Sequence, residues 1–161
     1  MQKRLFSLAV LCLFVFGLAS VAMAEVKKFT NISVDVPADY MVAEEDGLVI
    51  VASPDERYFF SVGVAARSDF GGKDDKTIAT EVSKKVNGST PEEGEGGGWS
   101  FTAIADGTKM DVDIMGDDDF VLIFMYDTNG DWPEAFSSVF TSIKGNDPKT
   151  HAFLQKVLLP D

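Results

Sequence analysis

A run of oxygen-bearing side chains at alternate positions could hold a calcium ion. Asp127, Asn129 and Asp131 match the first, third and fifth positions of an EF-hand loop, which supply oxygen ligands. Such a loop also needs glycine at its sixth position and a bidentate glutamate at its twelfth, where Trp132 and Ser138 stand here. A strand-to-helix turn with Asp131 as N-cap explains the same residues. A weak calcium site of looser geometry therefore stands as an alternative.

Five further aspartates gather on and beside one expected hairpin. They are Asp111, Asp113, Asp117, Asp118 and Asp119. Like charges packed together repel one another unless water, a cation or a basic partner screens them. We expect a basic partner to be drawn to this end of the molecule, at a rate that falls as salt screens the field. Trp99, on the paired strand, is the candidate apolar anchor for that partner if its side chain is exposed.

The residues that most enzymes use are nearly absent. His151 is the only histidine and Cys12 the only cysteine, whereas zinc and copper sites usually take several such ligands. A Ser-His-Asp triad requires a positioned serine, and no nucleophile-elbow sequence occurs. No two carboxylates are marked as a pair set across a cleft for glycoside hydrolysis. We therefore expect a non-catalytic protein without a cofactor, and a small hydrolase ranks third among the functions considered.

The first 24 residues have the three parts of a secretory signal. Lys3 and Arg4 give a positive start, an apolar run follows over 5–16, and residues 22–24 (Ala-Met-Ala) match the small-x-small pattern of signal peptidase. A retained membrane anchor is the alternative, because the apolar stretch nearly reaches the length of a spanning helix. We expect cleavage after residue 24, no stable membrane insertion afterwards, and a periplasmic or secreted protein.

Charge narrows the range of partners. Two of the 14 lysines and arginines precede residue 25, whereas all 26 acidic residues follow it, so 25–161 carries a net charge of −14. Such a charge disfavours nucleic acid, because each phosphate contact needs a basic side chain, and it disfavours anionic membrane surfaces. The length of this segment suits one hydrophobic core, so we expect 25–161 to be a single domain.

Alternating apolar residues and turn signals predict seven strands and three helices. The strands are expected over 30–36, 40–43, 48–52, 58–66, 99–105, 108–115 and 120–126. The helices are expected from Asp74 or Asp75 to Val86, from a capping box of Asp131 and Glu134 to Gly145, and from Asp147-Pro148 onward. The first four strands are joined by short turns, which indicates an antiparallel meander.

The strand over 120–126 indicates the fold class. Its residues are apolar on both faces, so we expect a central strand that is covered on each side. The order of four strands, a helix, three strands and two helices predicts an α+β fold. We expect one antiparallel sheet of about six or seven strands with helices on both faces, arranged as a three-layer α/β/α sandwich.

The opening and closing segments of the domain resemble the Mog1/PsbP-like fold family, which includes bacterial envelope proteins of the DcrB type. Phe29–Tyr40 reads as an alternating strand, a proline turn and an aromatic residue, and the closing helix ends in Val139–Ile143. The likeness covers most of 25–161 in layout. This chain departs from the family in lacking a lipid-bearing cysteine at the cleavage point and in carrying a further C-terminal helix. The resemblance implies an adaptor or accessory role.

The leading functional prediction is therefore an exported, non-catalytic accessory or binding protein of the bacterial envelope. Its expected partner is another envelope protein, and the negative charge favours a basic one. The alternative is a weak calcium-binding module of the same fold, with Asp127, Asn129 and Asp131 as ligands.

Overall fold

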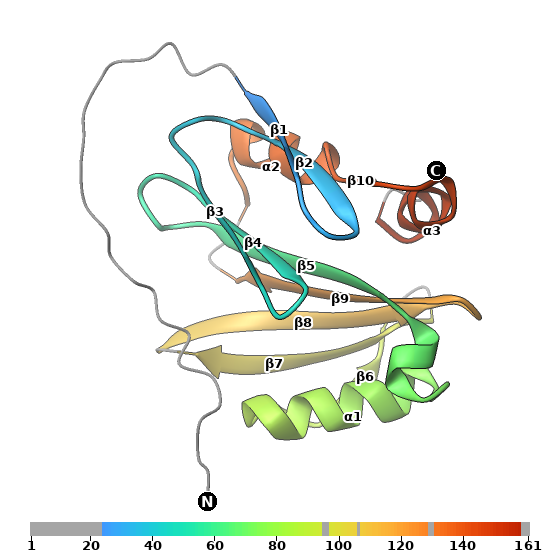
Figure 1. The fold of residues 1–161 in the computed structure, drawn as a ribbon. Coiled ribbons are helices and arrows are strands. Elements are labelled where there is room, and N and C mark those ends of the chain that lie inside the picture. Colours follow the sequence, from blue (N-terminus) through green and yellow to red (C-terminus); the bar gives the residue numbers. More distant parts are fainter. Residues whose placement is uncertain (1–23, 95–96, 106, 129–130, 159–161) are drawn as a thin grey trace, which may run out of the picture.

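A seven-stranded antiparallel sheet runs through the middle of the molecule (Figure 1). The computed structural model describes residues 24–94, 97–105, 107–128 and 131–158. The strands of the main sheet, in spatial order, are β3 (Met41–Glu45), β4 (Leu48–Ala52), β5 (Phe59–Ala66), β9 (Phe120–Asp127), β8 (Thr108–Gly116), β7 (Trp99–Ala105) and β6 (Glu92–Glu93). The predicted α+β class and antiparallel sheet are confirmed.

Helix α1 (Asp75–Val86) lies against one face of this sheet, over β7 and β8 (Figure 1). A short 3-10 helix, η1 (Arg67–Phe70), connects it to β5. The helix begins where predicted, because Asp74 Oδ1 accepts a hydrogen bond from Thr77 N at 2.7 Å and so satisfies a backbone donor of the first turn. It ends at Asn87, whose φ of 53° places it in the left-handed region that closes many helices.

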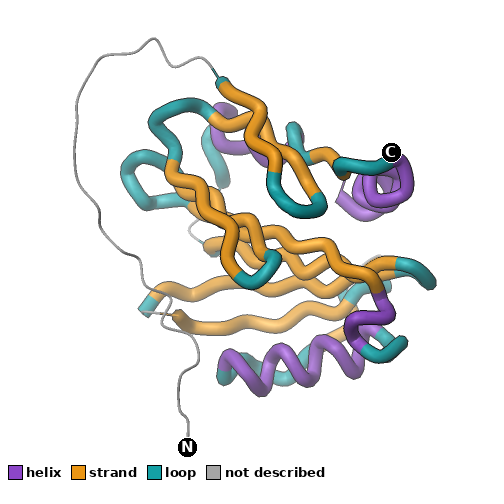
Figure 2. Tube along the Cα trace, viewed as in Figure 1, coloured by secondary structure: helices purple, strands orange, loops and turns teal. Residues whose placement is uncertain are grey.

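The opposite face of the main sheet is covered by a second sheet and two helices (Figures 1 and 2). This small sheet has the order β1 (Glu25–Lys28), β2 (Ile32–Val36) and β10 (Lys144–Gly145), and the helices are α2 (Glu134–Thr141) and α3 (Pro148–Leu158). We predicted that the strand over 30–36 belongs to one continuous sheet, and this was wrong. Its apolar face is buried over the main sheet, whereas its edges pair with β1 and β10.

The two C-terminal helices begin differently. The carboxylate of Asp147 caps α3 as predicted, since Oδ1 accepts from Lys149 N at 2.9 Å and from Thr150 N at 3.1 Å. The capping box predicted for α2 is absent among its described residues, because Pro133 occupies the N-cap position and provides no side-chain hydrogen bond. Helix α2 also ends before Gly145, which pairs with β2 instead of closing the helix.

Strand β9 is the middle strand of the main sheet, as its two apolar faces predicted. Leu122 is fully buried on the side of α2 and α3, and Val121 is fully buried on the side of α1. The sheet thus separates two hydrophobic cores. The larger core includes Phe60, Val62, Leu122, Phe136, Val139 and Leu154, and the smaller one includes Ile78, Phe101, Val112 and Ile114.

The described residues contain no helix that is both long and apolar enough to cross a membrane. Of the signal peptide predicted over 1–24, only Ala24 lies within the described residues.

Candidate functional site

A strip of the main sheet, on the face opposite α1, carries polar and aromatic side chains from β7, β8 and β9. Asp111 on β8 is in register with Tyr126 on β9, and Asp113 is in register with Phe124. Ser100 on β7 stands opposite Asp113 on the other side of β8. Because residues in register point to the same face of a sheet, these five side chains form one patch.

Two adjoining hollows open over this strip. One has a volume of about 640 Å³, and its aromatic walls are Phe124, Tyr126, Trp132 and Phe140. The other has a volume of about 520 Å³, and its polar lining includes Thr90, Glu92, Glu93, Ser100, Thr102 and Asp113. Asp111 and Tyr126 line both hollows. The two therefore form one depression, which we call the acidic–aromatic groove.

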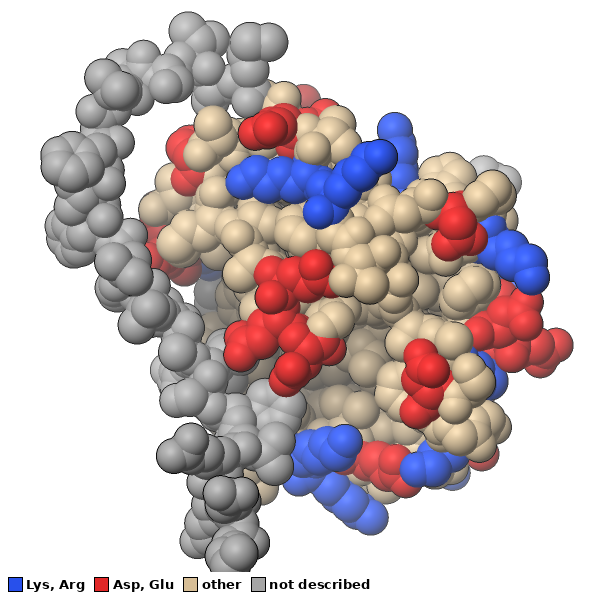
Figure 3. Space-filling view, in the orientation of Figure 1, with Lys and Arg blue, Asp and Glu red and all other residues tan. Residues whose placement is uncertain are grey.

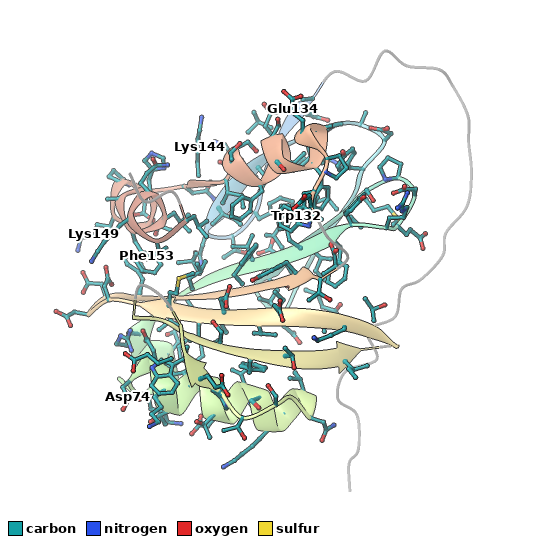
Figure 4. The ribbon with its side chains drawn as sticks, turned by 180° about the vertical axis from the view of Figure 1, so that it is seen from behind. Asp74, Trp132, Glu134, Lys144, Lys149 and Phe153 are labelled. Carbon is teal, nitrogen blue, oxygen red and sulfur yellow. The ribbon has the colours of Figure 1, made fainter. Side chains whose placement is uncertain are left out.

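Trp132 organises the aromatic wall of the groove. Figure 4 shows it between α2 and the main sheet. Its ring meets those of Tyr126 and Phe140 edge-on, with centroids 6.1 and 5.7 Å apart, and it packs on the buried Phe136 at 4.9 Å. Phe124 and Tyr126 stack at 5.0 Å. The wall is thus built on the larger core, and its outer rings present π-faces and edges that attract cations and apolar groups.

Asp113 is held by two hydroxyl groups. Ser100 Oγ donates to Asp113 Oδ1 at 2.6 Å, and the Tyr126 hydroxyl group also hydrogen-bonds to this carboxylate. Burial, and then the negative charges of Asp113 and Asp111, raise the pKa of Tyr126 to about 12. The Tyr126 hydroxyl group donates this hydrogen bond and helps to hold Asp113 in place.

Asp111 differs from Asp113 in having no protein partner. Its side chain is half-buried, and the carboxylate forms no hydrogen bond or ion pair with any residue that the structure describes. No lysine or arginine occurs among the described residues that line the two hollows, whereas Glu92, Glu93 and Asp131 also lie there. The groove is therefore negative, with an unpaired carboxylate at the junction of its polar and aromatic halves.

The predicted calcium ligands have different surroundings. Asp127 has an exposed fraction of 2% and its Oδ2 accepts from Phe59 N at 2.8 Å, so it joins the end of β9 to the start of β5. Asp131 is exposed and lines the groove, and Asn129 lies outside the described residues. Among the residues that the structure describes, no three histidine, cysteine, aspartate or glutamate side chains form a group suited to a metal ion.

The predicted turn of Asp117, Asp118 and Asp119 lies at the other end of β8 from Asp111. Six residues of extended chain, at about 3.3 Å each, separate it from Asp111 by about 20 Å. The Asp117 carboxylate serves its own turn, where Oδ1 accepts two backbone hydrogen bonds at 2.8 and 2.9 Å. The guanidinium group of Arg67 donates to the carbonyl oxygen of Asp117. Asp118 and Asp119 are exposed.

Trp99 lies on the face of the sheet that carries α1. It pairs in register with Ile114, whose side chain belongs to the smaller core, and it is partly buried there. The Lys76 ammonium group stands 4.8 Å from the centroid of its indole ring. The structure thus does not bring Trp99 together with Asp111 and Asp113, although Trp99 shares another hollow with part of the aspartate turn.

Sequence reasoning did not select Tyr126, Trp132 or Glu92 as site residues. The available signal was the hairpin between β7 and β8, whose register places Ser100 opposite Asp113. The position of Trp132 over the sheet depends on where α2 packs, and no local pattern predicts that packing.

Comparisons with known proteins do not place this chain in a family. No family model matches it, and no curated protein does. Among solved structures, it is similar to a protein from Bacteroides thetaiotaomicron VPI-5482, whose crystal structure was determined at 1.50 Å. The identity is 16% and the TM-score 0.40, over 73% of this chain and 46% of that one. This chain thus spans about half the length of that protein.

Proposed function

We propose that this protein is a non-catalytic binding protein whose acidic–aromatic groove holds a basic segment of another protein. The observation that carries the proposal is Asp111, a half-buried carboxylate without a protein partner beside the ring of Tyr126. A carboxylate in such a place is stabilised when a cation from a partner forms charge-assisted hydrogen bonds with it. The neighbouring rings stabilise the same cation through their π-electrons.

Arginine matches this groove better than lysine does. Its guanidinium group is planar, donates two parallel hydrogen bonds to a carboxylate and stacks on aromatic rings. Asp111 offers the carboxylate, and Tyr126 and Trp132 offer the rings. Glu92, which is in register with Ser100 across the polar hollow, favours further positive charge in the same segment. We therefore propose an extended, arginine-containing segment as the occupant.

The setting that we propose is the bacterial envelope. The signal-like segment over 1–24 supports export. The resemblance of the opening and closing segments to the Mog1/PsbP-like family supports an accessory role for another envelope protein. We extend the same resemblance to the fold and propose a three-layer arrangement around the main sheet.

Binding of a four-residue arginine peptide, blocked at both ends, tests the function. We expect Asp111→Asn to weaken its affinity about tenfold, because a hydrogen bond to a charged group contributes about 1.5–3 kcal/mol. Titration calorimetry measures the dissociation constants. A tetralysine peptide should bind less tightly than tetra-arginine, and a tetraglutamate peptide should not bind.

Asp118→Asn provides the matched control for net charge. It removes the same single charge as Asp111→Asn, but from an exposed turn about 20 Å away along the strand. We expect this control to change the affinity by less than twofold. Equal losses in the two variants would show that the peptide responds only to the overall field, and the proposed site would then be wrong.

A further inference from the structure

A second cavity lies on the other side of the main sheet, beside α1. Its volume is about 320 Å³, which is at the lower end of the range for ligand cavities. Apolar side chains from β4, η1, α1 and β9 surround it, including Leu48, Phe70, Val82, Val86, Ile123 and Met125. None of these residues belongs to the acidic–aromatic groove.

The cavity exists because α1 covers only part of its face of the sheet. The contacts of the helix are mainly with β7 and β8, and the cavity lies where its residues Val82 and Val86 adjoin β9, β5 and β4. Gly63 has no side chain, and Leu48 folds over its backbone, where an added Cβ atom would meet Leu48 Cδ2 at 2.7 Å. The Leu48 side chain therefore occupies the place that a side chain at position 63 would take, and it forms part of the cavity lining.

The shape of the cavity selects the kind of occupant. Its walls come from the β3–β4 turn on one side and from η1 and α1 on the other, and Figure 3 shows the molecule hollowed between that turn and the helix. A helix with its side chains is about 10–12 Å across, which is too wide for a cavity of this volume. A single alkyl chain or a small apolar ring is narrow enough to enter.

Three charged groups surround the mouth. Asp46 and Lys85 line it, and both are exposed. Glu45 stands opposite Leu48 in the β3–β4 pair, so its side chain lies on the same face as the cavity. Two carboxylates against one ammonium group leave the mouth negative, in a protein that is strongly negative as a whole.

We infer that this cavity binds a single-chain cationic amphiphile. The apolar chain fills the space between β9 and α1, where it removes Ile123 and Met125 from water. The cationic head remains at the mouth, where Asp46 and Glu45 attract it and Lys85 opposes it. This binding is independent of the acidic–aromatic groove, which lies on the other face of the sheet.

Binding of three ten-carbon probes, each below its micelle concentration, tests the inference. We expect decyltrimethylammonium to bind at least fivefold more tightly than decyl maltoside, which has a neutral head, and decanoate to bind most weakly. Val86→Trp should weaken all three at least tenfold, because the indole ring occupies the space of the chain. Lys84→Trp places the same side chain at an exposed position two residues earlier in α1 and should leave the affinities unchanged.

A double substitution tests the role of the head group. Glu45→Gln with Asp46→Asn should abolish the preference for the cation, and asparagine suits the left-handed φ of 51° at position 46. Asp118→Asn with Asp119→Asn removes the same charge elsewhere and should preserve the preference. Lys85→Glu should strengthen cation binding. The inference is wrong if decanoate binds most tightly, or if Val86→Trp and Val82→Phe, both folded by circular dichroism, bind the probes like the wild type.

Discussion

The hydroxyl group of Tyr126 lies where the two halves of the acidic–aromatic groove meet. Burial and the charges of Asp113 and Asp111 raise its pKa from the ordinary value of 10.0 to about 12. Between these two pH values the folded protein keeps a proton on Tyr126 that the unfolded chain releases. The contribution of this proton to the free energy of unfolding is therefore fully present below pH 10, and it is lost as the pH rises through about 12.

A spectrophotometric titration of the three tyrosines tests this assignment. We expect the wild type to show an ionisation step near pH 12 that is missing in Tyr126→Phe. Asp113→Asn should move the step to lower pH, because it removes a negative charge and a charged hydrogen-bond acceptor. Identical titration curves for the wild type and Tyr126→Phe would contradict the environment described for this side chain.

At the scale of elements, neighbouring positions on the two faces of β9 are buried to different degrees. Leu122 has an exposed fraction of 0% in the larger core, whereas Ile123 is only partly buried and lines the cavity beside α1. We expect Leu122→Asp to lower the free energy of unfolding by about 4 kcal/mol or more. Ile123→Asp should cost about 2 kcal/mol, since its carboxylate can reach water through the cavity.

Denaturant unfolding of the two variants measures this difference. Ile123→Asn separates the effect of charge from that of lost apolar surface at the milder position. Equal destabilisation by the two aspartate substitutions would mean that the face toward α1 is as dry as the opposite one.

Elements with strong local signals could be predicted from the sequence. Helix α1 has a capping aspartate and apolar residues at helical spacing, and β9 has apolar residues on both faces, so each was located within a residue or two. The two-residue strands β6 and β10 have no pattern of their own and exist only through pairing. The sheet to which β2 belongs was missed for the same reason, because alternation identifies a strand but not its neighbour.

The whole molecule carries an excess of negative charge, at −12 for the full chain and −14 for 25–161. Self-repulsion in the folded state should therefore weaken as salt screens it. We expect the melting temperature to rise by about 3 °C between 10 and 300 mM sodium chloride, which corresponds to about 1 kcal/mol. Scanning calorimetry measures the shift, and a melting temperature that does not change with salt would contradict the expectation.

Part of the candidate site could be predicted from the sequence. Asp111 and Asp113 were selected from their alternation on β8, and both line the acidic–aromatic groove. Trp99 was expected beside them. Successive residues of a strand point to opposite faces of the sheet, however, and the pairing with Ile114 places Trp99 on the face that carries α1. The aromatic wall could not be predicted, because Trp132 contacts Tyr126 and Phe140 only through the packing of α2 on the sheet.

The small sheet can be completed only late in the synthesis of the chain. Strand β2 is complete at residue 36, but β10, which pairs with its second edge, ends at residue 145. At about 5–20 residues per second, a ribosome leaves that edge unpaired for roughly 5–20 s. During that time the second edge of β2 has no partner strand, and an unpaired strand edge is open to pairing with other chains. We therefore expect the nascent protein to be most vulnerable to aggregation in the interval before β10 is complete.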